Sequence, residues 1–226
     1  MKTSLKPYRG PRRPEEVVDG INAAIRNARR LVNDAKTLLD LSRFPTAASL
    51  AILSIEESEK VTILRGIARA PDEKICQTLW NDYTNHRRKN ASWIIPDLWE
   101  NGARDIDSLL PVYEPKANHT ALLEQVKQSG LYTDYRGKSG WSEPGKEIDE
   151  ETARRLVNSA ILLQHRNFIT LKEIELWIEH MKPVYHEPFE VQKIALLNFN
   201  RALKKEGLHV HLEGGISVED FLNISQ

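Results

Sequence analysis

The sequence has little of several features that would indicate a particular class of protein. It contains one cysteine, Cys76, which excludes an internal disulfide and, beside Ile75 and Leu79, is typical of a small core residue. Basic and acidic residues number 32 each, so no net charge draws the chain towards nucleic acid or an anionic membrane. No apolar run approaches the roughly 18 residues of a membrane span, and no signal-peptide pattern is present. We therefore expect a cytoplasmic protein without membrane contact.

Several sequence motifs of catalysis are also missing. There is no Gly-rich phosphate loop, no nucleophile elbow and no Cys-x-x-Cys pair, so ATP-driven and acyl-transfer chemistry are unsupported. His209 and His211 would point to the same side of a strand, as metal ligands can, and Glu213 is near, but no further ligand has a sensible spacing. We expect neither a cofactor nor a bound metal.

Apolar residues recur at steps of three and four over most of the chain, which predicts helices. Pro45 suits a first helical turn, Asp149 is a good N-cap, and Gly130 is a plausible stop signal. No alternation of strands with helices is visible, so we predict an all-α bundle of about five main helices, with extra short helices and one long exposed loop at 136–147. The predicted helices cover residues 14–42, 46–69, 72–94, 118–128, 150–181 and 187–206, with a last turn from Ser217 through Leu222.

The length of 226 residues suits one sizeable core better than two independent ones. Residues 1–14 carry five basic side chains and three prolines, which predicts a flexible basic arm. We expect residues 15–226 to form a single domain. Within it, residues 208–212 alternate between apolar and polar, a pattern typical of a short extended piece.

Two short polar groups lie within helices that are otherwise apolar. The first, Glu56–Lys60, interrupts the helix predicted at 46–69, and the second, His86–Lys89, lies near the end of the helix predicted at 72–94. Ionisable groups on a buried helix face are costly unless they are paired, so each group needs a packing reason or a chemical one. The candidate functional residues are therefore expected here.

Two interpretations of His86 remain open from its sequence context. In the functional one, His86 removes a proton from a ribose 2′-hydroxyl, while Lys89 or Arg87 stabilises charge developing on the phosphate. His86 and Lys89 are three residues apart, which on a helix places them on one face. In the structural one, His86 is a capping or core histidine beside a solvated basic turn.

The acidic group also admits two interpretations. Glu56, Glu57 and Lys60 could orient His86 and Lys89 from the facing helix, with one glutamate pairing with Lys89 and Lys60 satisfying the other. Alternatively, they form an internal ion-pair cluster that fixes helix register. The spacing of Glu56 and Lys60 favours an ion pair on one helix face. The neighbouring Glu59 is expected to face solvent.

The aromatic residues are interpreted mainly as structural. Tyr132, Asp134 and Tyr135 could line the mouth of the site, but we favour a role in covering the end of the bundle. The tryptophans are scattered, which is more typical of core and interface anchors than of base-stacking platforms. They are Trp80, Trp93, Trp99, Trp141 and Trp177.

Five segments in this order resemble the AbiV family of abortive-infection proteins, within the HEPN superfamily of helical bundles. The resemblance covers roughly residues 22–182, and its order and spacing are more specific than any one motif. The segments are Asn27-Ala28-Arg29-Arg30-Leu31 through Asp34-Ala35, Phe44-Pro45-Thr46-Ala47-Ala48-Ser49-Leu50-Ala51-Ile52-Leu53, Glu56-Glu57-Ser58-Glu59-Lys60, His86-Arg87-Arg88-Lys89 and Ser129-Gly130-Leu131-Tyr132-Thr133-Asp134-Tyr135.

The resemblance implies a compact helical bundle that pairs into a homodimer and a role in bacterial defence against phage. Many HEPN relatives are metal-independent ribonucleases with an Arg, a polar residue, several variable residues and then a His. This chain departs from that pattern, because no arginine precedes a histidine by four to six intervening residues; Arg201 and His209 are separated by seven. A ribonuclease site here would rest on His86 and Lys89.

Three functional hypotheses follow. The first is a defence protein that acts on RNA or the translation machinery, possesses endoribonuclease activity if it is an enzyme, and responds to a phage protein activator. The second is a non-catalytic helical protein that binds a phage or host protein. The third, weaker hypothesis is a ligand-sensing bundle with a pocket between the second and third helices.

Overall fold

The computed structural model describes residues 9–86, 88–114, 118–208 and 217–224, which form helices and turns but no β-strand. The all-α prediction is therefore confirmed for this part of the chain. The α-helices are α1 (Pro14–Asp40), α2 (Phe44–Arg69), α3 (Glu73–Thr84), α4 (Ile95–Glu100), α5 (His119–Leu131), α6 (Pro144–Glu147), α7 (Glu150–Leu162), α8 (Leu171–Met181), α9 (Phe189–Lys205) and α10 (Val218–Phe221). The 3-10 turns are η1 (Arg88–Asn90), η2 (Ser92–Ile94), η3 (Leu110–Tyr113) and η4 (Gly137–Ser139).

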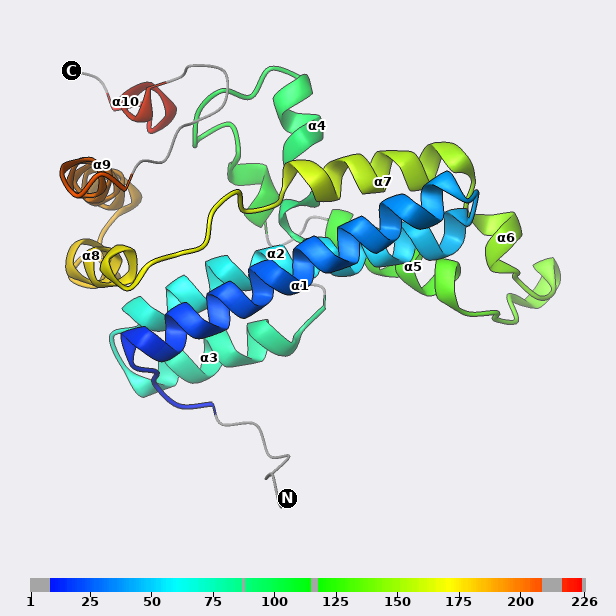
Figure 1. Cartoon of the computed structure of the whole chain (residues 1–226), viewed down its shortest axis with the longest axis horizontal. Helices are drawn as coiled ribbons and strands as arrows, with labels where there is room; N and C mark the ends of the chain where they lie inside the picture. Colours follow the sequence, from blue (N-terminus) through cyan, green and yellow to red (C-terminus); the bar gives the residue numbers. More distant parts are fainter. Residues whose placement is uncertain (1–8, 87, 115–117, 209–216, 225–226) are drawn as a thin grey trace.

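Helix α2 is the centre of the molecule. It runs beside α1 along most of its length and also packs against α3, α5, α7 and α8 (Figure 1). A helix covered on several sides needs apolar residues on several sides, which explains why α2 shows no single apolar stripe. As predicted, Pro45 lies in its first turn, where a missing backbone N–H costs nothing.

The core along α1 and α2 consists of two hydrophobic clusters. One includes Ile52 and Ile55 of α2 with residues of α5 and α7, and the other includes Val61 and Leu64 with residues of α3 and α8. Between them, residues 56–60 of α2 form a polar layer. The polar group predicted to be unusual therefore lies where the two apolar clusters meet.

Two long helices predicted from periodicity are each interrupted. The helix expected over 72–94 ends at Thr84, because Asn85 takes an extended conformation and its side chain accepts a hydrogen bond from the Arg88 backbone at 3.4 Å. The helix expected over 150–181 is two helices, because α7 ends at Leu162 and α8 begins anew after Thr170. Thr170 and Glu173 form a reciprocal capping box, a start signal that the apolar periodicity obscured.

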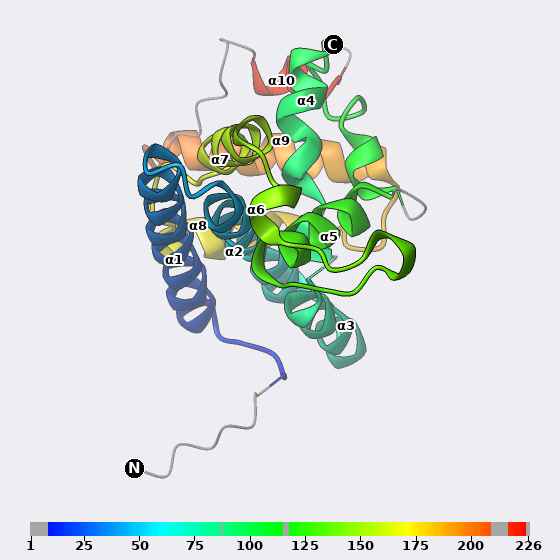
Figure 2. The ribbon, with the colours of Figure 1, turned by 90° about the vertical axis from the view of Figure 1, so that its right-hand side faces the viewer.

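Gly130 does not end α5, which continues to Leu131. A Cβ atom at Gly130 would lie 2.5 Å from Ser49 Oγ and 2.9 Å from the Pro45 carbonyl oxygen. Only glycine therefore allows α5 to approach the start of α2 this closely. Figure 2 shows α5 beside α2, with α6 and the turns around it at the same end of the molecule.

Several smaller predictions can be compared with the structure. Asp149 and Ser217 are N-caps whose side chains accept from the backbone N–H groups of Thr152 and Asp220, and Cys76 is buried. The segment 136–147 is mostly exposed, as expected, but includes η4 and α6. Trp141 is no core anchor, because it is 71% exposed and its ring lies against that of Tyr135, which is also exposed.

The two ends of the chain are described only in part. Near the N-terminus, the Trp80 indole donates to the Gly10 carbonyl at 3.0 Å and Arg9 donates to Asn81 at 2.9 Å, so this segment contacts α3. His209 and His211 lie outside the described residues, as does most of the extended piece expected at 208–212.

Candidate functional site

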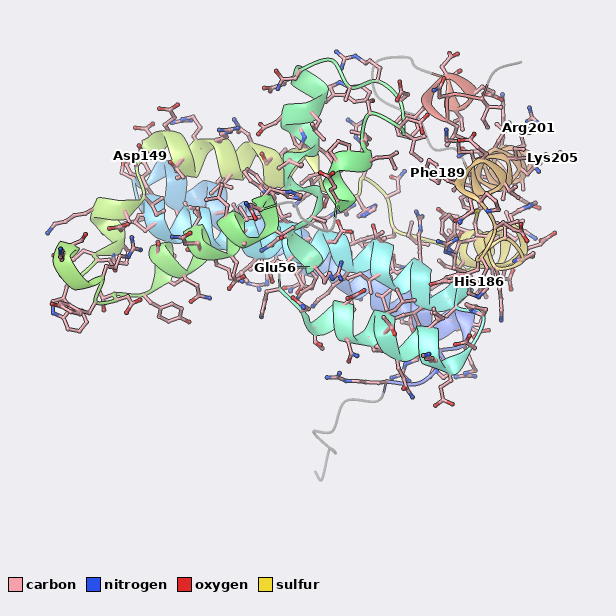
Figure 3. The ribbon with its side chains drawn as sticks, turned by 180° about the vertical axis from the view of Figure 1, so that it is seen from behind. Glu56, Asp149, His186, Phe189, Arg201 and Lys205 are labelled. Atoms are coloured by element: carbon pink, nitrogen blue, oxygen red, sulfur yellow. The ribbon has the colours of Figure 1, made fainter. Side chains whose placement is uncertain are left out.

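Three elements meet at the polar layer of α2. The chain leaving α3 crosses α2 as η1, and η1 also packs against α5. This crossing carries His86 and Lys89 to Glu56 of α2, while α5 brings Glu124 and Lys127 to the same point. Figure 3 shows the labelled Glu56 in the middle of the molecule, where these ribbons come together. His86 and Lys89 thus belong to a turn and do not share a helix face, contrary to the basis of the sequence prediction.

Glu56 lies at the centre of this cluster and is only 2% exposed. Its Oε2 atom is 2.7 Å from His86 Nδ1 and 3.6 Å from Lys89 Nζ, and its Oε1 atom is 2.6 Å from Lys127 Nζ. The Lys127 ammonium also lies 2.7 Å from Glu124 Oε2. We call Glu56, His86, Lys89, Glu124 and Lys127 the Glu56 cluster.

His86 is the exposed member of the Glu56 cluster, with 56% of its side chain accessible. The 2.7 Å contact identifies Nδ1 as the donor to the Glu56 carboxylate, because a hydrogen bond to an ionised acceptor is the stronger arrangement. In that tautomer Nε2 carries the lone pair. No described residue hydrogen-bonds Nε2, so it can accept a proton from a molecule outside the protein.

The two lysines of the cluster are buried beneath this histidine. Burial alone lowers the pKa of Lys127, but its hydrogen bonds with Glu124 and Glu56 outweigh that cost and the net pKa is raised. Lys89 is farther from its partner, so burial prevails over the attraction of Glu56 and lowers its pKa. Burial likewise opposes ionisation of Glu124, but hydrogen bonds from Lys127 and Gln128 leave its pKa lowered.

Apart from His86, the charges of the cluster cancel. Two carboxylates, Glu56 and Glu124, face two ammonium groups, Lys89 and Lys127. Glu56, His86 and Glu124 could together offer three ligand atoms to a metal ion, all within 4.8 Å of one another. The Lys127 ammonium contacts both carboxylates and lies 3.4 Å from His86 Nδ1, so it takes the place that a bridging cation would need.

The remaining predicted site residues have different positions. Glu57 and Lys60 pair with each other at 2.6 Å, so Lys60 satisfies Glu57 and not Glu56. The Lys60 ammonium also lies 4.9 Å from the ring centroid of Tyr83. Arg87 lies outside the described residues.

The prediction that Glu59 faces solvent is wrong, because the residue is only 6% exposed. The η1–η2 segment covers this side of α2, and the Ser92 hydroxyl donates to the Glu59 carboxylate. Burial raises the pKa of Glu59 to about 7, with the Ser92 hydrogen bond opposing the shift. This cover was not predicted, because one uninterrupted helix over 72–94 would not contain the η1–η2 segment that forms it.

Sequence reasoning missed Glu124 and Lys127. Lys127 continues the buried stripe of α5, since Leu123 precedes it by four residues and Gly130 follows it by three. A lysine on such a stripe is a signal of a buried partner, and Glu124 three residues earlier provides one. The stripe was visible in the sequence, but the approach of α5 to Glu56 depends on tertiary packing.

The chain was compared with protein families, curated proteins and solved structures. A model of the AbiV family of HEPN proteins matches residues 16–165, which include every member of the Glu56 cluster. No curated protein matches the chain, and no solved structure does. In the described part of the chain, no helix combines the length and the apolarity that crossing a membrane requires. The match spans well over half of the sequence, and the chain belongs to the AbiV family of HEPN proteins, a family of abortive-infection proteins in antiphage defence.

Proposed function

We propose that this protein serves antiphage defence as a metal-independent endoribonuclease with His86 as its general base. The observation that carries the proposal is one contact, the 2.7 Å hydrogen bond from an exposed imidazole to a carboxylate that is 2% exposed. A buried carboxylate that fixes the ring and its tautomer is a recurring way to prepare a histidine for proton transfer. His86 could reach a bound RNA, because the same ring is 56% exposed.

The proposed reaction needs only the RNA itself. His86 Nε2 removes the proton of a ribose 2′-hydroxyl, and the oxygen attacks the adjacent phosphorus. The bond from phosphorus to the 5′-oxygen breaks, which leaves a 2′,3′-cyclic phosphate. The leaving 5′-oxygen takes a proton from water to become a 5′-hydroxyl, and His86 returns its own proton to solvent. When His86 becomes positively charged, the Glu56 carboxylate stabilises the imidazolium at 2.7 Å.

The lysines take positioning roles in this proposal. Lys89 and Lys127 are 7% and 5% exposed at their side chains, so they hold Glu56 in place and do not contact the RNA. The phosphate contact is assigned to Arg87, which follows His86 directly in the sequence. We further propose that the protein works as a homodimer, that its target is RNA of the host or phage, and that a phage protein triggers it.

His86→Ala tests this proposal. We expect the variant to lose toxicity in cells and RNA cleavage in the presence of a chelator, with a nearly unchanged melting temperature, because Glu56 keeps both lysines. The control is His180→Ala, which changes a histidine of α8 that the proposal does not use. A folded His86→Ala protein that cleaves RNA at the wild-type rate would remove the catalytic assignment.

The second candidate function is a non-catalytic protein that binds a phage or host protein. The observation that favours it is the complete internal pairing of the buried charges, which an ion-pair cluster that only fixes helix register would also show. Purified wild-type protein that degrades no RNA, yet forms a stoichiometric complex with one component of infected cells, would favour this function.

A further inference from the structure

The opposite side of α2 carries a second group of charges with a different character. Arg65 follows Glu56 by nine residues, which on a helix is a rotation of about 180°. Arg65 and Arg69 lie one turn apart and both guanidinium groups contact one indole of α8: their Cζ atoms are 5.6 Å and 5.8 Å from the Trp177 ring centroid. Arg69 Cζ is also 4.9 Å from the ring centroid of Tyr185. We call these four residues the Arg65 cluster.

The guanidinium groups of this cluster are not part of an ion pair among the described residues. No carboxylate in this part of the chain lies within 4.0 Å of a side-chain nitrogen of Arg65 or Arg69. The Nε atom of Arg65 is inaccessible to solvent and has no hydrogen-bond partner among the described residues. The Arg69 side chain donates to a neutral group, the Gln192 side-chain oxygen, at 3.3 Å. Burial accordingly lowers the pKa of both arginines.

The residues around the Arg65 cluster bring more positive than negative charge close to it. Burial lowers the pKa of His165 to about 4, and the positive charges of Arg65 and of Arg29 in α1 add to this shift. The carboxylate that acts on Arg65 is that of Glu173, but this group accepts from the Thr170 backbone at 2.9 Å in the capping box of α8. Ser58, two turns before Arg65 on the same face of α2, has a buried hydroxyl that finds no hydrogen-bond partner in the described part of the chain.

We propose that the Arg65 cluster binds a small phosphorylated ligand through its two guanidinium groups. Two partly buried guanidinium groups beside one indole, with the Arg65 Nε atom inaccessible, lose part of their hydration, and the contacts with the aromatic rings offset only part of that cost. A bound anion would balance the charge of the two guanidinium groups, as the carboxylates of the Glu56 cluster balance its two ammonium groups. The planar guanidinium suits phosphate oxygens because it can donate two parallel hydrogen bonds.

Enclosure argues for a small ligand over a nucleic-acid strand. The Arg65 Nε atom is inaccessible, and all four residues of the cluster are partly buried where α8 packs against α2. The shared chemistry is a phosphate group, which inorganic phosphate and a mononucleotide both provide. In Figure 3 the labelled His186, next to Tyr185 in sequence, lies at the end of the molecule and away from Glu56, so this site is separate from the proposed catalytic one.

The experiment measures binding of inorganic phosphate and of AMP to the full-length protein, by calorimetry and by melting temperature at constant ionic strength. We expect both probes to bind and to raise the melting temperature, whereas chloride does not. Arg65→Met and Arg69→Met should each weaken binding by at least about 10-fold, as expected for loss of charge-assisted hydrogen bonds. Arg65→Lys, which keeps the charge without the planar fork, should also bind more weakly than wild type.

Arg30→Met is the matched control, because Arg30 is 62% exposed on α1 and pairs with Asp34. AMP binding that is tighter than phosphate binding would identify a nucleotide whose base contacts the aromatic rings, and equal affinities would identify the phosphate group alone. The proposal is overturned if neither probe binds, if Arg65→Met and Arg69→Met bind as wild type does, or if only single-stranded RNA binds. None of these results depends on RNA cleavage.

Discussion

The charged side chains on the two sides of α2 differ in how they are paired. Around Glu56, two carboxylates and two ammonium groups cancel, and one histidine extends from the group into solvent. Around Arg65, two guanidinium groups share an aromatic ring and have no carboxylate within ion-pair distance in the described structure. A compensated cluster is complete without a ligand and can prepare a reactive group. A group of cations without carboxylate partners is completed by an anion from outside the protein. We therefore expect α2 to support a reaction on the Glu56 side and ligand binding on the Arg65 side.

The largest loss of stability is expected from Lys127→Met, which removes one of the two ammonium groups that balance the carboxylates of the Glu56 cluster. The substitution leaves Glu56 and Glu124 facing each other with Lys89 as the remaining ammonium, so an uncompensated negative charge stays buried. We expect a loss of about 3 to 5 kcal/mol in the free energy of unfolding, measured with urea. Lys146→Met, at a lysine that is 74% exposed, serves as the control and should change little. A loss for Lys127→Met as small as that of the control would contradict the account.

Glu59→Gln tests the effect of a buried anion that has no cation at ion-pair distance in the described structure. The pKa of Glu59 rises from 4.5 to about 7 on folding, so folded Glu59 binds its proton more tightly than unfolded Glu59 and the wild type loses stability between those pH values. Glutamine avoids this loss and can still accept from Ser92. We expect a gain of roughly 1 to 3 kcal/mol at pH 8 and little difference at pH 4.5. A gain that is equal at both pH values would refute the titration of Glu59 as the cause.

Gly130→Ala tests how the compensated cluster is assembled. The new Cβ would meet Ser49 Oγ and the Pro45 carbonyl, so α5 must shift away from α2 and carry Lys127 with it. We expect a loss of about 1 to 2 kcal/mol, because overpacking outweighs the better helix propensity of alanine. Gly145→Ala, at a position with nothing within 4 Å, should be neutral. Equal stabilities of the two variants in thermal unfolding would show that the close approach of α5 is unimportant.

The smallest change is expected from Arg65→Met without ligand. Removal of a partly buried guanidinium without a carboxylate at ion-pair distance in the described structure should leave the stability within about 1 kcal/mol of the wild type or raise it, in contrast to Lys127→Met. Urea unfolding of both variants in phosphate-free buffer gives the comparison directly. A loss for Arg65→Met as large as that for Lys127→Met would show that Arg65 is compensated after all.

The sequence predicted the helical class and the residues of the polar layer, but not how they meet. Periodicity located α1, α2, α5 and α9 closely, because each has an apolar face of sufficient length. It failed at Asn85 and at 163–170, where local capping interrupts an apolar pattern that continues on both sides. The Glu56 cluster was found only in part, since Lys127 arrives from α5 through a contact that Gly130 permits. Such a contact is a property of the packed molecule and leaves little trace in a single sequence.

The Arg65 cluster shows the same limit more clearly. The arginines are one turn apart near the end of α2, a pattern shared by many solvated helix ends. Their burial depends on α8, whose independent start was hidden within the longer helix predicted over 150–181. Without α8 in place, nothing in the sequence distinguishes Arg65 from an exposed arginine.

The most direct test of the central claim is a double-mutant cycle in RNA cleavage with His86→Ala and Glu56→Gln, measured with a chelator on variants shown to be folded. If Glu56 acts through the ring of His86, each single variant loses cleavage and the second substitution costs no further activity in the background of the first. Full cleavage by His86→Ala, or losses that simply add in the double variant, would contradict the account.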